Sequence, residues 1–156
     1  MGYLILLIAL ILFLVCLAIV VFKKKNSIDS VSFKDSFEKS NLPIITLYND
    51  CYTLNFLIDT GSTFSCIDTN TLKYLNYINT NASREVVTVN GVNESPVILM
   101  TINDSTDCVE ELFTVVDMGN SNSINDGITI HGILGSTFCK RANFVIDYNE
   151  LKVYSK

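Results

Sequence analysis

Hydrophobic and polar residues are unevenly distributed along this chain of 156 residues. Residues 3–22 contain no charged side chain, whereas residues 23–41 are mostly polar and show little apolar periodicity. From residue 42 onward, short runs of β-branched and aromatic residues are separated by Gly, Asn and Asp, which is typical of strands joined by turns. The pattern predicts an apolar segment over 3–22, a polar tether over 23–41 and one mostly β domain over 42–156.

Within that domain we expect strands over residues 44–48, 52–58, 86–89, 92 onward, 97–102, 112–116, 128–130, 144–147 and 151–154. The pairs Asn49-Asp50 and Asn90-Gly91 fall between two strands each. Such pairs predict hairpins, because Asn, Asp and Gly tolerate the positive φ that tight turns require. Short helices are predicted over 69–75 and 137–141, the second with Ser136 as a candidate N-cap.

The apolar segment is long enough to cross a membrane. Twenty helical residues span roughly 30 Å, the thickness of the hydrocarbon core of a bilayer. No basic residue precedes the segment, which favours a retained single span over a cleaved signal peptide. Lys23, Lys24 and Lys25 follow it directly, so the positive-inside rule predicts a cytoplasmic location for the domain.

Charge and composition exclude several functions. Residues 42–156 hold 6 basic and 13 acidic side chains, which gives a net charge of −7 and argues against a nucleic-acid partner. Four cysteines of this region are widely spaced and the chain has one histidine, so no zinc site, other metal or cofactor is expected. A serine or cysteine hydrolase would have to use that histidine, His131. The position of His131 is more typical of an ordinary loop or strand end.

The most informative segment is Phe56-Leu57-Ile58-Asp59-Thr60-Gly61-Ser62. It places a carboxylate after a buried strand and before a turn in which glycine allows a sharp bend. A second motif, Gly132-Ile133-Leu134-Gly135, precedes the helix predicted over 137–141. Together with the hairpin at Asn90-Gly91, these motifs resemble the retropepsin-like aspartic proteases in order and spacing, over residues 43–155.

The resemblance implies a mostly β, closed barrel-like single lobe with short helices. It also implies hydrolysis of protein or peptide substrates by a homodimer, because this lobe has one such motif and the reaction uses two carboxylates, here Asp59 from each subunit. The family's roles would then fall on these residues: Thr60 braces the paired turns, Gly61 permits close approach, Ser62 donates to the carboxylate, Ile133, Leu134 and Gly135 pack around the turn, and Asn90 and Gly91 form a flap.

The sequence departs from the retroviral members of the family at two places. Thr63 and Phe64 stand where those members have an acidic residue, and Ser136 stands where they have an arginine. The ion pair between subunits in that group is therefore missing. The alternative hypothesis is a catalytically inactive domain of the same family that acts as a membrane-anchored, dimeric peptide-binding adaptor.

Overall fold

The computed structural model describes residues 10–13, 28–88, 91–104, 106–119, 123–124 and 127–156. The predicted membrane span over 3–22 lies outside the described residues except for residues 10–13, which are helical. Within the described residues, no helix has the length and apolar character needed to cross a membrane. Residues 23–27 of the predicted tether and Asn90 of the predicted flap also lie outside the described part of the chain.

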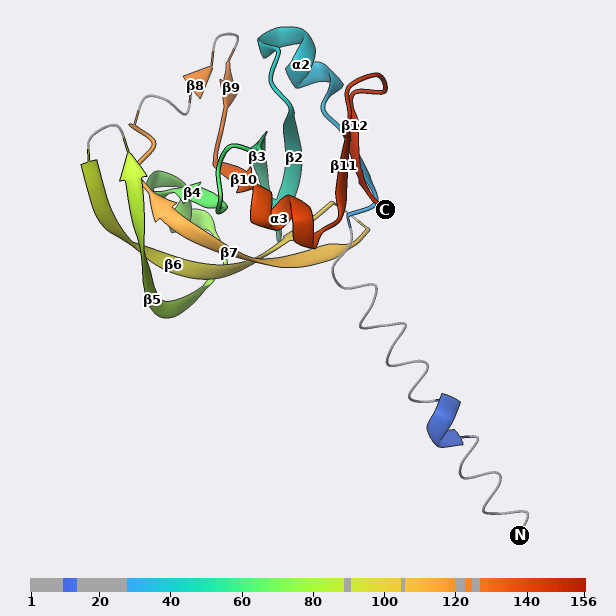
Figure 1. Ribbon diagram of the computed structural model, residues 1–156, viewed down its shortest axis with the longest axis horizontal. Helices are drawn as coiled ribbons and strands as arrows, with labels where there is room; N and C mark the ends of the chain where they lie inside the picture. Colours follow the sequence, from blue (N-terminus) through green and yellow to red (C-terminus); the bar gives the residue numbers. More distant parts are fainter. Residues whose placement is uncertain (1–9, 14–27, 89–90, 105, 120–122, 125–126) are drawn as a thin grey trace.

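The described domain is mostly β, as the sequence predicts, and it has three short helices, of which the first, over Lys34–Ser40, was not predicted (Figure 1). Its strands are β1 (Ser30–Ser32), β2 (Ile44–Asn49), β3 (Tyr52–Asp59), β4 (Cys66–Asp68), β5 (Ile78–Thr88), β6 (Gly91–Asn103), β7 (Cys108–Val116), β8 (Ser123–Ile124), β9 (Ile128–Thr129), β10 (Gly132–Gly135), β11 (Phe144–Asp147) and β12 (Lys152–Ser155). The helices are α2 (Lys34–Ser40), the 3₁₀ helix η1 (Thr69–Tyr74) and α3 (Ser136–Arg141).

A seven-stranded sheet in the order β2-β3-β10-β4-β7-β6-β5 forms the body of the domain. A further pairing between Tyr48 of β2 and Asn103 of β6 joins the two sides of this sheet and closes it into a ring. The predicted barrel-like closure is therefore confirmed. Strand β5 lies outside the ring and pairs along its length with β6, where it forms the long hairpin seen at the lower left of Figure 1.

Most predicted strands are confirmed. Their buried side chains alternate with more exposed ones, which is the pattern on which the predictions were based. Leu54, Phe56 and Ile58 of β3 are buried, whereas the residues between them are only partly buried. The hairpin of β5 and β6 is longer than predicted, and its register pairs Thr88 with Gly91. Gly91, with a φ of 119°, is thus the first residue of β6 rather than the second residue of the turn.

The predicted tether is wrong from residue 28 onward. Ile28 and Phe33 are fully buried members of the hydrophobic core, and β1 pairs antiparallel with β12 near the C-terminus. Burying one large apolar side chain stabilises a fold by about 1.5–3 kcal/mol, which explains why a mostly polar segment is held in place by two such residues. The folded domain therefore begins by residue 28, not residue 42.

Both helix predictions need a correction in detail. The segment after β4 forms a 3₁₀ helix whose N-cap is Asp68, with the Asp68 carboxylate accepting a hydrogen bond from the backbone N–H of Asn70. Ser136 is not the N-cap of the later helix. It is the first residue of α3, Gly135 occupies the N-cap position, and the Ser136 hydroxyl donates to the carbonyl of Ser62 instead.

Candidate active site

The Asp59 turn, defined as residues 59–65, begins where β3 ends. Strand β10 lies parallel to β3 at this point, with Leu134 beside Ile58 and Gly135 beside Asp59 (Figure 1). The two sequence motifs, more than seventy residues apart in the chain, are therefore adjacent strands in one sheet. Leu134 is fully buried beside Ile58, whereas Ile133 is only partly buried.

Asp59 is held by its own turn. Its Oδ1 accepts a hydrogen bond of 2.9 Å from the backbone N–H of Gly61, and its carbonyl accepts one of 3.2 Å from the N–H of Ser62. A Cβ atom on Gly61 would lie 3.1 Å from the same carboxylate oxygen, so glycine permits this close turn. The Asp59 side chain is partly buried and Thr60 is exposed, so both are open to a binding partner.

The predicted role of Ser62 is wrong. Its hydroxyl donates to the carbonyl oxygen of Phe64 at 2.8 Å and not to the carboxylate of Asp59. This hydrogen bond closes the second half of the turn onto itself. Ser62 thus stabilises the backbone that carries Asp59, while Gly61 supplies the N–H that binds the carboxylate.

Helix α3 fixes the turn from the other side. The backbone N–H and the hydroxyl of Ser136 both donate to the Ser62 carbonyl, at 2.8 and 3.0 Å. The corresponding groups of Thr137 donate to the Thr63 carbonyl at 3.2 and 2.7 Å. The N–H of Gly135 donates to the buried hydroxyl of Ser65 at 3.2 Å. Sequence reasoning missed Thr137 and Ser65 as supporting residues. The available signal was that each is a short polar residue that closely follows one of the two motifs.

Replacing Gly135 by alanine should destabilise the fold and displace the Asp59 turn. The added Cβ would lie 2.5 Å from the backbone carbonyl carbon of Phe64, a distance that no side-chain rotation can relieve. We expect urea denaturation to show a loss of about 1–3 kcal/mol in the free energy of unfolding, the usual cost of overpacking. Ser136→Ala is the control that removes one hydrogen bond without adding volume. Equal stability of Gly135→Ala and the wild type would contradict the close contact.

A groove of about 500 Å³ opens beside the turn. We call it the main groove; its lining residues are Gly61, Ser62, Thr63, Phe64, Ser65, Cys66, Arg84, Glu85, Val86, Val87, Thr114, Val116, Asp117, Met118 and Ile133. One wall is therefore the Asp59 turn and the opposite wall is β5, one strand of the predicted flap hairpin. Of the described part of that hairpin, Arg84, Glu85, Val86 and Val87 line the groove and Gly91 does not.

A sequence model of the aspartyl protease family matches residues 45–138, a region that contains β3, the Asp59 turn, the hairpin and β10. The chain belongs to the aspartyl protease family. This assignment confirms the resemblance found in the sequence.

Two solved structures are similar to this member of the aspartyl protease family. A retropepsin-like aspartic protease from Rickettsia conorii is 14% identical, with a TM-score of 0.46, and the match covers 81% of this chain and 88% of that one. A protein of unknown function from Legionella pneumophila is also 14% identical, with a TM-score of 0.40 and coverage of 64% and 85%. Comparison with curated proteins gives no match. The family assignment therefore rests on the sequence model and on the motifs.

His131 has a structural role in this aspartyl protease domain. Its Nδ1 accepts a hydrogen bond of 2.9 Å from the backbone N–H of Asn55, and its own backbone N–H donates to the carbonyl of Asn55. Burial lowers the pKa of the imidazole, opposed by the nearby charge of Asp68, which favours the neutral form that can accept this bond. With Nδ1 occupied by the backbone, His131 is poorly placed to serve as the general base of a serine or cysteine hydrolase.

Cys66 lines the main groove but has the wrong chemistry for a nucleophile. Burial raises the pKa of its thiol to about 11; a hydrogen bond with the backbone of Ile133 opposes the shift, and the negative charges of Asp59 and Asp68 add to it. A thiol with this pKa is protonated near neutral pH, and the thiolate is the reactive form. Among the described residues, no cluster of His, Cys, Asp and Glu has the arrangement of a metal site.

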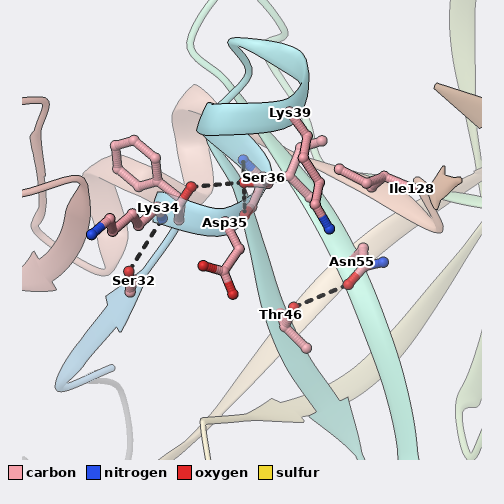
Figure 2. A pocket seen from close by; sticks show the side chains of 10 residues that line it. Ser32, Lys34, Asp35, Ser36, Lys39, Thr46, Asn55 and Ile128 are labelled. Carbon is pink, nitrogen blue, oxygen red and sulfur yellow. Dashed lines mark hydrogen bonds between the residues drawn. The ribbon is translucent and has the colours of Figure 1, made fainter. Parts of the chain in front are cut away.

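A second cavity, of about 300 Å³, lies between α2 and the strands β2 and β3 (Figure 2). Asp35 and Lys39 point toward it from α2, and the Thr46 hydroxyl donates to the Asn55 side chain at its floor. None of the residues predicted for catalysis lines this cavity. The main groove, which includes Gly61 and Ser62, is therefore the candidate active site.

Proposed function

We propose that the protein is an aspartic endopeptidase that acts as a homodimer, with Asp59 of each subunit forming the catalytic pair. One observation carries the proposal: in a chain of the aspartyl protease family, the partly buried Asp59 accepts a hydrogen bond from the N–H of Gly61, a residue that lines the main groove. A single lobe supplies one such carboxylate. Symmetric pairing of two copies would supply the second.

The chemistry requires two carboxylates in different protonation states. In aspartic proteases a carboxylate pair shares one proton, because like charges so close together cannot both ionise. The ionised Asp59 would take a proton from a water molecule, which attacks the carbonyl carbon of the peptide bond. The protonated Asp59 of the other subunit would donate to the carbonyl oxygen and, as the C–N bond breaks, a proton would pass to the leaving amine.

The remaining predicted residues would support this reaction. Thr60 is exposed next to Asp59 and, in the proposed dimer, would contact the same turn of the second subunit. The main groove would hold an extended peptide, whose backbone could pair with the outer strand β5 while its side chains enter apolar pockets. The apolar part of that lining is supplied by Phe64, Val86, Val87, Val116, Met118 and Ile133. The flap predicted at Asn90 and Gly91 would close over the peptide and exclude water.

Mixing active and inactive subunits tests the dimer. With equal amounts of wild-type and Asp59→Asn subunits, re-equilibrated together, random pairing leaves about one quarter of the dimers with two carboxylates. The activity should therefore fall to about one quarter of that of the same total amount of wild-type protein. A residual activity of one half, independent of pre-equilibration, would indicate that each subunit works alone and would contradict the shared site.

We further propose that residues 3–22 anchor the protein in a membrane, with the protease domain in the cytoplasm. The support is the uncharged segment and the three lysines that follow it. Two copies held in one membrane would have a raised effective concentration, which favours pairing of domains that lack the retroviral type of intersubunit ion pair. Protease protection of the domain in sealed vesicles, measured with a tag at Lys156, would test the orientation.

A further inference from the structure

We propose that Arg84 selects substrates with an acidic side chain in the main groove. This inference rests on the proposed peptidase function and specifies which peptides the site prefers. Arg84 comes from the middle of β5, and its side chain crosses to the opposite wall. The guanidinium carbon lies 3.7 Å from the centroid of the Phe64 ring, and one terminal nitrogen donates to the Thr114 hydroxyl at 2.9 Å.

The position of Arg84 is fixed but its charge is not compensated. Phe64 and Thr114 hold the guanidinium by stacking and by one neutral hydrogen bond. Within the described part of the chain, no carboxylate forms an ion pair with it. A guanidinium has five N–H donors in a planar fork that matches a carboxylate, so most of its donors are left for another partner.

The acidic residues of the groove do not fill that role. Asp117 is exposed, and its Oδ1 accepts a hydrogen bond from the backbone N–H of Gly119 at 2.9 Å. Glu85 is also exposed; it follows Arg84 on β5 and lines the groove, and within the described part of the chain no ion pair joins the two side chains. Arg84 is the only basic residue that lines the groove among the described residues, in a domain region with a net charge of −7.

These features define the preferred peptide. Arg84 is stacked on Phe64 of the Asp59 turn and both line the groove, so an acidic side chain could bind Arg84 while the same extended peptide passes the catalytic turn. The apolar lining favours aliphatic residues on either side. Glu85 and Asp117 would repel a run of negative charge, so the preference should be for one acidic residue within an apolar segment.

The test uses the full chain and a set of amidated, N-acetylated peptides of the same length. In each set one position is Glu, Gln or Lys and all other positions are identical. Amidation removes the C-terminal carboxylate, so only a side chain can supply the negative charge. The assay is run near pH 6, where the Glu side chain is ionised. Cleavage is measured as kcat/KM, and binding to Asp59→Asn protein is measured in parallel by fluorescence anisotropy.

We expect one position at which wild-type protein prefers Glu over Gln by about 10- to 100-fold, the range of a charge-assisted hydrogen bond. Arg84→Gln should lose this preference, so that its kcat/KM values for the Glu and Gln peptides become equal, and Arg84→Glu should prefer the Lys peptide. Lys73→Gln and Lys73→Glu are matched controls. The Lys73 Nζ also lies over an aromatic ring, 4.8 Å from the centroid of the Tyr74 ring, but Lys73 does not line the groove. Both controls should keep the Glu preference.

The outcomes separate this proposal from the proposed function. If the wild type cleaves peptides without a Glu preference, or if Arg84→Gln slows cleavage of all three peptides equally, Arg84 is a structural residue and the proposal is overturned. If no peptide is cleaved but Asp59→Asn protein binds the Glu peptide selectively through Arg84, the proposal stands and the peptidase function fails. Absence of both cleavage and selective binding overturns both.

Discussion

Replacing Asp59 by asparagine should abolish peptide hydrolysis. Asparagine has nearly the same shape but cannot take a proton from water, and the substitution removes the carboxylate from both subunits of the proposed dimer. General acid–base catalysis contributes about 10²–10⁴-fold to a rate, and we expect a loss at least at the upper end of that range. The measurement is kcat/KM for a peptide substrate found with wild-type protein, over a range of pH from acidic to neutral.

The same substitution should leave the fold intact. The side-chain oxygen of asparagine can still accept the hydrogen bond that the N–H of Gly61 gives to Asp59 Oδ1. Because the side chain is only partly buried, no large desolvation change is expected, and the free energy of unfolding should change by less than about 0.5 kcal/mol. A circular dichroism melt compared with that of the wild type measures this effect.

Asp147→Asn is a matched control for this experiment. Asp147 also accepts backbone hydrogen bonds through one carboxylate oxygen, from the N–H groups of Asn149 and Glu150, but it belongs to β11, on the separate three-stranded sheet. Its substitution should leave kcat/KM unchanged. If Asp59→Asn retains wild-type activity, the carboxylate is not catalytic. Peptide binding without hydrolysis, in both the wild type and Asp59→Asn, would favour the adaptor hypothesis.

The sequence predicts the barrel and the Asp59 turn because both depend on local patterns. Alternation of buried and partly buried residues marks β3, and a carboxylate followed by glycine marks the turn that ends it. Residues 28–33 show no such local pattern, because Ile28 and Phe33 are separated apolar residues in a mostly polar segment. Both are buried in the core, and the segment between them pairs with the distant strand β12. The Ile28 N–H also donates to the hydroxyl of Ser155, 127 residues away. A pairing with such a distant strand cannot be predicted from the local sequence pattern.

The supporting residues of the candidate site escape sequence reasoning for a related reason. Thr137 and Ser65 are ordinary polar residues until the parallel pairing of β3 with β10 brings the start of α3 against the Asp59 turn. The role of Arg84 is equally hidden in the sequence, because its stacking on Phe64 depends on the position of β5 relative to the Asp59 turn. Ser62 shows the opposite error. A family motif suggested its role, but the local geometry gives its hydroxyl to the Phe64 carbonyl.

Replacing Arg141 by methionine should strongly destabilise the domain. Arg141 ends α3 and forms an ion pair with Glu111 of β7, whose side chain is only 4% exposed, and it also donates to the Glu110 carbonyl at 2.9 Å. Without Arg141 the carboxylate of Glu111 is left buried with no opposite charge. Breaking a buried pair in this way costs about 3–5 kcal/mol. Because the arginine side chain is 44% exposed, water can partly replace it, and we expect about 3 kcal/mol by urea denaturation.

A double-mutant cycle separates the ion pair from packing. Glu111→Leu combined with Arg141→Met replaces both charges by apolar groups, which is often neutral for a buried pair, so the double variant should recover most of the stability lost by Arg141→Met. Glu150→Leu with Lys152→Met is the control cycle, because that pair is 4.0 Å apart and more exposed, and its coupling should be near zero. Additive effects at Glu111 and Arg141 would show that the pair is not coupled.

Since α3 also carries the Ser136 and Thr137 contacts to the Asp59 turn, Arg141→Met should lower kcat/KM even at temperatures where the domain is still folded, and the double variant should restore it.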